Sequence, residues 1–354
     1  MTPLAEILTQ RIAKAGPISV AEYMAECLLH PEHGYYATRD PFGAGGDFTT
    51  APEISQMFGE IAGLWLAQVW LDQGAPAPFT LAEPGPGRGT LMADILRATR
   101  AVPGFRDAAR VHLVEASPTL RGIQRETLAG CEATWCGSVA ELPDQPLFLI
   151  ANEFFDALPI RQFQRDAGGW RERQVAVIGG RLAFGLSDPA PIAALDARLA
   201  DTRPGDIVET CPQAAPIIAE IAARIEAHGG AALIFDYGGW HSLGDTFQAL
   251  RGHEPDDPLA HPGAADLTAH VDFEALAAAA PGLTALPLTG QGMFLERLGI
   301  TARAQALAAK LRGPALESHI AAHRRLTHPQ EMGTLFKTLA LMPINAPTPP
   351  GFAP

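Results

Sequence analysis

The sequence predicts an α/β protein built on a mostly parallel β-sheet. Three observations indicate this class: short apolar segments typical of buried strands, helical patterns between them, and a glycine-rich turn directly after the first strand. Of the 354 residues, 47% are hydrophobic and 18% are charged, which provides for a large core and excludes global disorder. Gly, Pro or a charged residue interrupts every apolar stretch, so no stretch predicts a membrane-spanning helix.

The N-terminal part is predicted to be mainly helical. Residues 1–35 have a helical pattern, and residues 36–52 form a loop rich in Gly and Pro. Residues 53–73 carry apolar side chains at helical spacing, directly after Pro52. We therefore expect residues 1–75 to form a helical segment with a lid loop.

The alternating part of the chain begins with the segment 79–83. Strands are predicted at 79–83, 111–115, 133–135, 147–151 and 231–236, and helices at 89–100, 117–129 and 213–228. Short apolar strands that alternate with helices are typical of βαβ units, so we expect residues 76–300 to form one sheet-based core.

Two segments interrupt this rhythm. Residues 160–187 read as antiparallel strands joined by Gly-Gly turns. Residues 238–272 form a long segment of little periodicity, which is usually functional when it lies in a compact domain.

The C-terminal part is predicted to be largely helical. Strands are expected near 284–288 and 292–296, and helices near 301–312 and 330–341. From Pro343 the many prolines predict an extended tail, so that residues 301–354 form C-terminal helices and a Pro-rich tail.

Charge and cysteine content limit the partners and the compartment. Lys and Arg total 26 against 39 Asp and Glu, a net charge of −13, which argues against nucleic acid as a partner. The four cysteines contain no C-x-x-C pair and indicate a reducing compartment rather than a disulfide framework or a zinc site. The first 16 residues have neither the pattern of a secretion signal nor that of a transit peptide. We therefore expect a cytoplasmic protein.

The strongest local signal is the segment Glu83-Pro-Gly-Pro-Gly-Arg-Gly-Thr90, which lies between a predicted strand and a predicted helix. Gly85, Gly87 and Gly89 let the backbone approach a ligand closely. Their G-x-G-x-G spacing differs from the G-x-G-x-x-G of dinucleotide-binding proteins. A carboxylate at Glu83 repels pyrophosphate and suits a cationic amino-acid group.

Two further strand ends complete a nucleoside site. Glu115, with Ala116 beside it, ends the second strand, where a carboxylate accepts both hydroxyls of a ribose. Ser138 and Val139 follow the third strand, where an adenine ring would lie. The alternative is that Glu115 is a solvated acid at the end of a strand and binds no ligand. An adenosine without phosphate, joined to a cationic amino-acid tail, is S-adenosylmethionine, which we predict as the cofactor.

The fourth strand ends in Asn152, Glu153 and Asp156, polar residues inside an otherwise apolar run. Such residues are costly to bury unless they are paired or face a ligand. In this topology the end of this strand faces the reactive methyl group. The alternative is that Asn152 and Asp156 cap a following helix.

These motifs resemble the MidA-type methyltransferases, a family similar to the mitochondrial complex I assembly factor that methylates protein arginine. The resemblance covers nearly the whole chain. The segments that carry it are Gly46–Ser55, Glu83–Thr90, Ala151–Pro159, Asp236–Gly238, Asp266–Phe273 and Met332–Lys337. It implies a class I, Rossmann-like, seven-stranded methyltransferase core with an N-terminal helical segment, inserted antiparallel strands and C-terminal helices. It also implies S-adenosylmethionine as methyl donor, an arginine-containing protein as substrate, and a complex I subunit as the client of the mitochondrial relative.

Roles for the site residues follow from this resemblance. A carboxylate binds a guanidinium through two parallel hydrogen bonds, and Glu153 is our first candidate for this role, Asp156 the second. Asn152 then supports the cofactor or the substrate, and Asp47 and Thr50 lie in the lid. The substrate-side candidates are Asp236, Tyr237, His270 and Asp272. The histidines show no tight ligand spacing, so we expect no metal.

Two alternatives remain open at this point. One is an NAD-dependent oxidoreductase of the Rossmann type, which the glycine spacing and Glu83 oppose. The other is a non-catalytic assembly chaperone that keeps the methyltransferase fold. The apolar helices near both ends of the chain are compatible with burial within one chain or within a homodimer.

Overall fold

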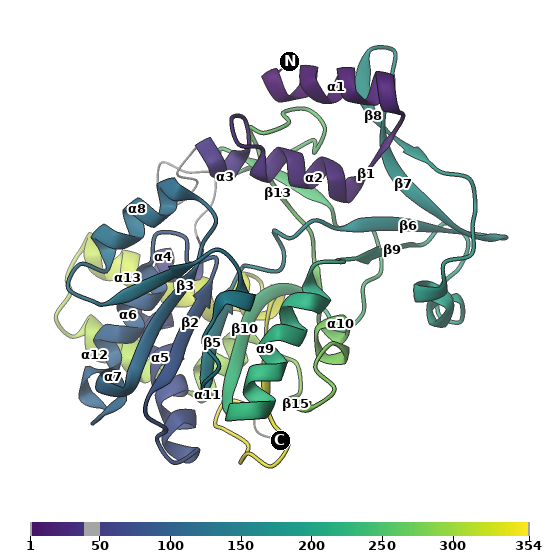
Figure 1. Ribbon diagram of the computed structural model, residues 1–354. Coiled ribbons are helices and arrows are strands. Elements are labelled where there is room, and N and C mark those ends of the chain that lie inside the picture. Colours follow the sequence, from purple (N-terminus) through teal and green to yellow (C-terminus); the bar gives the residue numbers. More distant parts are fainter. Residues whose placement is uncertain (1, 39–49, 353–354) are drawn as a thin grey trace. The chain divides into compact units, whose positions relative to one another are not determined.

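The computed structural model describes residues 2–38 and 50–352, and the chain divides into two compact units (Figure 1). The parallel-sheet unit comprises Thr49–Phe154, Pro216–Gly238 and Phe273–Pro354. The antiparallel unit comprises Met1–Phe48, Phe155–Ala215 and Gly239–Asp272. Asp47, predicted to lie in the lid, falls outside the described residues.

A single sheet organises the parallel-sheet unit, with its strands in the order β15-β17-β10-β5-β2-β3-β4. Neighbouring strands from β10 to β4 run parallel, whereas β17 is antiparallel to both β10 and β15. The strands are β2 (Phe79–Pro84), β3 (Ala109–Val114), β4 (Ala133–Cys136), β5 (Leu147–Asn152), β10 (Gly230–Gly239), β15 (Leu283–Ala285), β16 (Thr289–Gly290) and β17 (Phe336–Pro343). This arrangement agrees with the α/β core predicted from the sequence.

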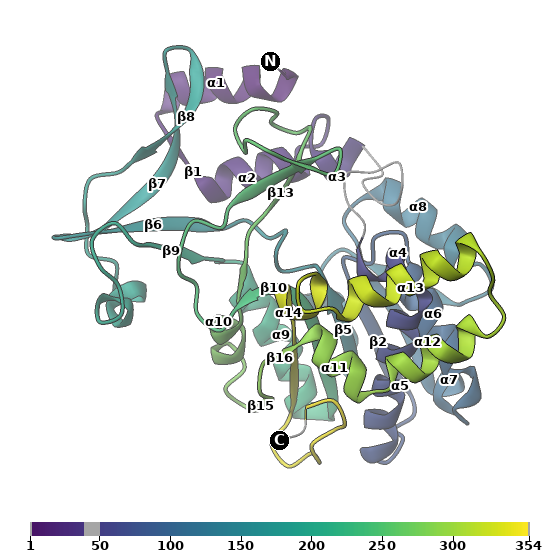
Figure 2. The same ribbon diagram turned by 180° about the vertical axis from the view of Figure 1, so that it is seen from behind.

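Helices cover both faces of this sheet. Helix α9 lies on one face (Figure 1), and α11 and α12 lie on the other (Figure 2). Every residue of β2 and β5 is buried, as expected for strands covered on both faces. The helices of this unit are α4 (Ala51–Ile54), α5 (Gln56–Asp72), α6 (Thr90–Ala98), η1 (Thr99–Ala101), α7 (Phe105–Ala108), α8 (Pro118–Thr127), η2 (Val139–Glu141), α9 (Ala214–His228), α10 (Phe273–Ala278), α11 (Gln291–Arg297), α12 (Ile300–Ala308), α13 (Pro314–Thr327) and α14 (Met332–Leu335).

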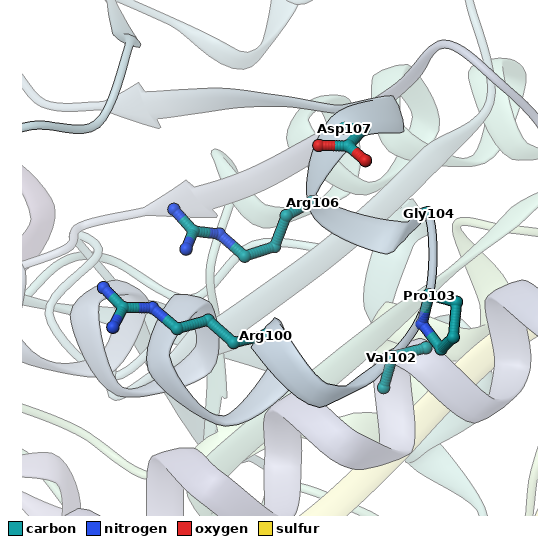
Figure 3. Close-up of a pocket in the computed structure, with 6 residues that line it drawn as sticks. All are labelled: Arg100, Val102, Pro103, Gly104, Arg106 and Asp107. Carbon is teal, nitrogen blue, oxygen red and sulfur yellow. The ribbon is translucent and has the colours of Figure 1, made fainter.

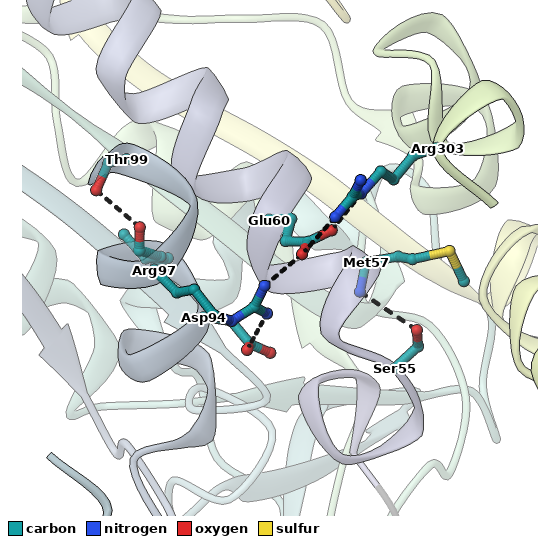
Figure 4. Close-up of polar contacts among 8 residues, drawn as sticks. Ser55, Met57, Glu60, Asp94, Arg97, Thr99 and Arg303 are labelled. Atoms are coloured by element: carbon teal, nitrogen blue, oxygen red, sulfur yellow. Dashed lines mark hydrogen bonds and ion pairs between the residues drawn. The ribbon is translucent and has the colours of Figure 1, made fainter. Parts of the chain in front are cut away.

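An ion network joins α5, α6 and α12 (Figure 4). Glu60 in α5 accepts hydrogen bonds from Arg97 of α6 at 2.5 Å and from Nε of Arg303 of α12 at 2.7 Å, and its side chain is only 5% exposed. Burial alone would raise the pKa of Glu60, but the two guanidinium groups outweigh it and lower the pKa. Arg97 also donates to Asp94 at 2.6 Å. The network therefore ties the C-terminal helix α12 to α5 and to α6, the helix that follows the glycine-rich turn.

The antiparallel unit contains two small sheets and the N-terminal helices. One sheet has the order β1-β7-β6-β9, with β8 paired to β7, and the other has the order β12-β11-β13. The elements are α1 (Pro3–Ala15), β1 (Ile18–Ser19), α2 (Val20–Leu29), α3 (Tyr35–Thr38), β6 (Arg161–Asp166), β7 (Gly169–Ile178), β8 (Arg181–Leu186), η3 (Ala193–Leu199), β9 (Ile207–Thr210), β11 (Gln248–Arg251), β12 (Glu254–Asp256), β13 (Asp266–Thr268) and β14 (Val271–Asp272). The antiparallel strands expected within residues 160–187 are β6, β7 and β8.

Two C-terminal elements differ from the sequence prediction. Residues 292–296, expected as a strand, lie in helix α11, and residues 330–341, expected as a helix, form α14 and most of β17. A short apolar run fits a buried helix or a buried strand equally well when it is judged locally. Residues 336–343 form a strand because β17 pairs with β10 on one edge and with β15 on the other. This pairing provides hydrogen-bond partners for the backbone groups on both edges of the strand.

Neither unit contains, in its described residues, a helix with the length and hydropathy that crossing a bilayer requires.

Candidate active site

The glycine-rich turn begins at the carboxyl end of β2 and leads into α6. Its glycines have positive φ angles of 62° at Gly85, 52° at Gly87 and 83° at Gly89. A Cβ added to Gly85 would lie 2.9 Å from the ring of Phe154, closer than real Cβ contacts allow. Both the backbone angle and the close approach therefore require glycine at this position.

Glu83 lies next to this turn and is nearly inaccessible, with 3% of its surface exposed. Among the described residues, its Oε2 atom has no hydrogen-bond partner. Burial raises the pKa of Glu83 well above its usual range, although a hydrogen bond from the Met92 backbone acts in the opposite direction. An ammonium group of a ligand would both pair the buried oxygen and stabilise its ionised form.

Glu115 follows β3 and is held by main-chain and side-chain donors. Its Oε1 accepts from the Ser117 backbone N–H at 2.7 Å, and its Oε2 accepts from Gln124 Nε2 at 3.1 Å. Burial nevertheless raises the pKa of Glu115. A carboxylate has about four acceptor positions, so this fixed group still has capacity for ribose hydroxyls.

Gln124 is a residue of the candidate site that the sequence did not lead us to select. Its fully buried amide donates to Glu115 and to the Gly87 carbonyl, the latter at 2.7 Å, and accepts from Trp135 Nε1 at 2.8 Å. It therefore joins the glycine-rich turn, the end of β3 and the strand β4. The sequence does contain an indication of this role. Gln124 lies four residues after Leu120, on the face of α8 that is buried, and a buried amide without a hydrogen-bond partner would be costly.

The predicted adenine-side residues lie at the end of β4. Ser138 and Ala116 are exposed, and Val139 is buried. The Ser138 hydroxyl donates to Glu141 Oε1 at 3.2 Å, and the Gly137 backbone N–H donates to Glu141 Oε2 at 3.0 Å. This bonding fixes the turn after β4.

Asn152 and Glu153 end β5 on the same edge of the sheet. Asn152 Nδ2 donates to Glu153 Oε1 at 3.0 Å, and the Ala51 backbone N–H donates to the same oxygen at 3.3 Å. In the described part of the chain, the buried Asn152 Oδ1 has no hydrogen-bond partner. Glu153 has a φ of 51°, an uncommon angle for a residue with a side chain. Such angles cost free energy and concentrate at functional sites.

The segment around Thr50 contacts this edge twice. Thr50 is buried and precedes α4, whose Ala51 donates to Glu153 as described. Glu53 Oε1 accepts from the hydroxyl of Thr90, the first residue of α6, at 2.5 Å. Glu53 is a second residue that the sequence reasoning did not select.

The substrate-side candidates fall into both units. Asp236 and Tyr237 are buried at the end of β10, and Asp236 Oδ1 accepts from the Tyr237 backbone N–H at 3.0 Å. Asp156, His270 and Asp272 belong to the antiparallel unit.

Main-chain bonds hold this second group. The Asp156 carbonyl accepts from the Ala269 N–H at 3.0 Å, and the His270 N–H donates to Thr246 Oγ1 at 2.9 Å. Asp272 Oδ2 accepts from the Ser242 N–H at 3.0 Å. No trio of His, Cys, Asp or Glu in the described ranges is grouped to hold a metal ion.

The parallel-sheet unit thus brings together the predicted cofactor residues that the structure describes in it. Two buried oxygens, of Glu83 and Asn152, await partners, and the turn is shaped for close approach of a ligand. Carboxylates at two strand ends fit an amino acid and a ribose and disfavour a pyrophosphate. These residues fit S-adenosylmethionine.

The fold and these strand ends define a class I, Rossmann-like methyltransferase. The model of a family described as S-adenosyl-L-methionine-dependent methyltransferases matches residues 61–290. The chain belongs to this family, and it is a methyltransferase that uses S-adenosylmethionine. The oxidoreductase alternative is therefore set aside.

Curated relatives and solved structures agree with this assignment. The chain is 39% identical to "Protein arginine methyltransferase NDUFAF7, mitochondrial" from Bos taurus, over 97% of this chain and 84% of the bovine protein. It is 38% identical to the Drosophila melanogaster homolog, over 96% of this chain and 85% of the fly protein. A COG1565 superfamily member from Burkholderia thailandensis, bound to S-adenosyl-homocysteine, superposes with a TM-score of 0.81 at 30% identity, covering 99% of this chain and 92% of that chain.

These relatives correct one expectation. The sequence led us to expect a cytoplasmic protein, whereas the curated relatives from cattle, humans and mice are named mitochondrial proteins. The prediction of a cytoplasmic location is therefore wrong. It rested on the pattern of the first residues and on the cysteine content, and neither identifies the compartment.

Proposed function

We propose that this methyltransferase acts on arginine side chains of a protein and that a subunit of respiratory complex I is its client. The support comes from the Glu153 carboxylate, which Asn152 and Ala51 orient at the end of β5, beside the residues that fit the cofactor. The names of the curated relatives support the same acceptor.

In this proposal Glu153 binds the substrate guanidinium through two hydrogen bonds and turns one nitrogen toward the methyl group. The cofactor supplies an electrophilic methyl group on a sulfonium. The arginine nitrogen would form a bond to the methyl carbon as the carbon–sulfur bond breaks, and the electron pair of that bond would stay on the sulfur of the thioether product. One proton would pass from the guanidinium to solvent. The protein contributes orientation, which lowers barriers by up to about 7–11 kcal/mol in favourable systems.

Glu83 is proposed to bind the ammonium group of the cofactor, and Glu115 its ribose hydroxyls. Ala116, Ser138 and Val139 are proposed to line the adenine. Thr50 and Asp47, in the segment that precedes α4, are proposed to belong to a lid over the cofactor. Asp156, Asp236, Tyr237, His270 and Asp272 remain candidates for contact with the protein substrate. Gln124 is proposed as a positioning residue, because it fixes both Glu115 and the glycine-rich turn.

A methyl-transfer assay tests the proposed acceptor. The purified protein is incubated with S-adenosylmethionine labelled in its methyl group and with lysate from a strain that lacks the gene. We expect label in one protein band and, after acid hydrolysis, in methylated arginine. Label in another amino acid would contradict the arginine assignment, and a labelled protein outside complex I would contradict the proposed client.

Binding of S-adenosylhomocysteine is expected to release a proton from Glu83. The raised pKa keeps this carboxyl protonated at pH values where an exposed glutamate is ionised, and the ligand ammonium favours the ionised form. The affinity should therefore rise as the pH increases toward the raised pKa. Calorimetry in two buffers of different protonation enthalpy measures the released proton, and Glu83→Gln should abolish the release. An unchanged release in that variant would exclude Glu83 as its source.

The contact between Glu53 and Thr90 is expected to stabilise the bound cofactor, since it joins α4 to the first residue after the glycine-rich turn. Glu53→Gln and Thr90→Val should each weaken S-adenosylhomocysteine binding about 5- to 10-fold, and the double variant no further, which corresponds to a coupling of about 1–1.4 kcal/mol. Calorimetric titration of all four proteins measures this cycle.

Thr99→Val provides the control, because the Thr99 hydroxyl donates to the Ile95 carbonyl one turn earlier in the chain, rather than to Glu53 or Thr90. Additive losses in the double variant would show that the Glu53–Thr90 contact does not act as a unit.

A further inference from the structure

A hollow of about 550 Å³ lies in the parallel-sheet unit, and its lining includes none of the residues that fit the cofactor (Figure 3). Its lining comes from one short stretch of chain: Arg100, Val102, Pro103, Gly104, Arg106 and Asp107. This stretch follows α6 and leads into the first residue of β3. It therefore lies at the amino edge of the parallel strands, opposite the edge that carries the glycine-rich turn.

The stretch is anchored to the core although its arginines reach the surface. Phe105 is fully buried, and its ring centroid lies 5.3 Å from that of Trp70 and 5.0 Å from that of Phe79. The Val102 N–H donates to Thr99 O at 3.0 Å, and the Ala108 N–H donates to Gly104 O at 3.0 Å. The hollow is thus carried by a fixed turn, which lowers the entropic cost of binding a ligand there.

The two arginines extend in the same direction on one side of the hollow (Figure 3). Arg100 is exposed and Arg106 is half-buried, and neither guanidinium forms a hydrogen bond or an ion pair with any residue in the described ranges. The lining also contains one acid, Asp107. A third guanidinium, that of Arg110, donates to the carbonyls of Asp107 and Ala109. Residues 100–110 thus carry three arginines against one aspartate, a local excess of positive charge in a chain of net charge −13.

We propose that this hollow binds a small phosphorylated ligand through Arg100 and Arg106. Guanidinium groups match phosphate oxygens with pairs of parallel hydrogen bonds, which ammonium groups cannot do. The volume lies within the range of small-molecule sites, about 300–1,000 Å³. A lining drawn from a single turn favours a small ligand over a protein surface. The site shares no residue with the methyl-transfer site and is independent of the arginine assignment.

Titration calorimetry with inorganic pyrophosphate, in phosphate-free buffer of low ionic strength, tests this site. We expect saturable binding of one pyrophosphate per chain, weakened at least tenfold in Arg100→Ala and in Arg106→Ala. The lysine variants Arg100→Lys and Arg106→Lys should also bind more weakly, because they keep the charge and lose the paired hydrogen bonds. Arg325→Ala is the matched control, an exposed arginine of α13 that should leave pyrophosphate binding unchanged.

S-adenosylhomocysteine binding by every variant verifies that the fold is intact, since within the described residues none of these arginines forms a hydrogen bond or ion pair with the residues proposed to bind the cofactor. If ADP binds more tightly than pyrophosphate, the ligand of the site is a nucleotide. If the two bind equally, the phosphate groups are sufficient for binding. Both results support the site. The absence of saturable pyrophosphate binding, or equal weakening by Arg325→Ala, would overturn the proposal. If the arginines bind only an acidic protein surface, no saturable pyrophosphate binding will be seen.

Discussion

Replacing Glu153 with glutamine is expected to slow methyl transfer about 100-fold, because loss of one partner of a close charge pair costs about 3 kcal/mol. Glutamine has nearly the same shape and keeps one acceptor oxygen, but it carries no charge to pair with a guanidinium. The backbone at this position has a φ of 51° in the native chain, and glutamine adopts this angle no less readily than glutamate does. The change therefore reports on the carboxylate rather than on the fold.

The measurement has two parts. Transfer of labelled methyl groups to the lysate substrate gives the rate, and calorimetry with S-adenosylhomocysteine gives the cofactor affinity, which should be unchanged. Glu317→Gln, an exposed carboxylate of α13, is the matched control and should retain full activity. Full methyl transfer by the Glu153 variant would exclude this carboxylate as the guanidinium ligand.

Replacing Gly85 with alanine is expected to reduce the affinity for S-adenosylhomocysteine at least about 100-fold. An alanine at a φ of 62° is strained by about 1–2 kcal/mol, and here its Cβ also lies 2.9 Å from the Phe154 ring. The turn must shift to relieve this contact, and the shift would displace the backbone that is proposed to approach the cofactor. A protein with alanine here should also melt at a lower temperature.

Gly74→Ala separates the effect of the strained backbone angle from the effect of the close contact with Phe154. Gly74 has a φ of 83°, but nothing lies within 4 Å of its added Cβ. This variant should lose about 1–2 kcal/mol of stability from the backbone angle alone and bind S-adenosylhomocysteine normally. If both glycine variants weakened ligand binding to the same degree, the close approach at Gly85 would not be the cause of the loss.

Much of the proposed cofactor site can be predicted from the sequence because the proposal depends on local chemistry. Glu83, Gly85 and Glu115 follow apolar strands directly, and the ends of neighbouring parallel strands meet at one edge of a sheet. The partnership of Gln124 with Glu115 and Gly87 was not readable. A glutamine in an amphipathic helix has no visible partner until the helix is packed against the sheet.

The sequence by itself determined the buried central strands, the glycine-rich turn and its acidic neighbours, because their hydrophobicity, backbone freedom and charge are properties of consecutive residues. Only the tertiary structure decided that residues 336–343 form a strand and residues 291–297 a helix. It also decided that Asp156, His270 and Asp272 belong to a different unit from Glu153. The physical reason is the same in both cases: backbone pairing and burial between segments far apart in the chain outweigh local preference, and no local window contains those partners.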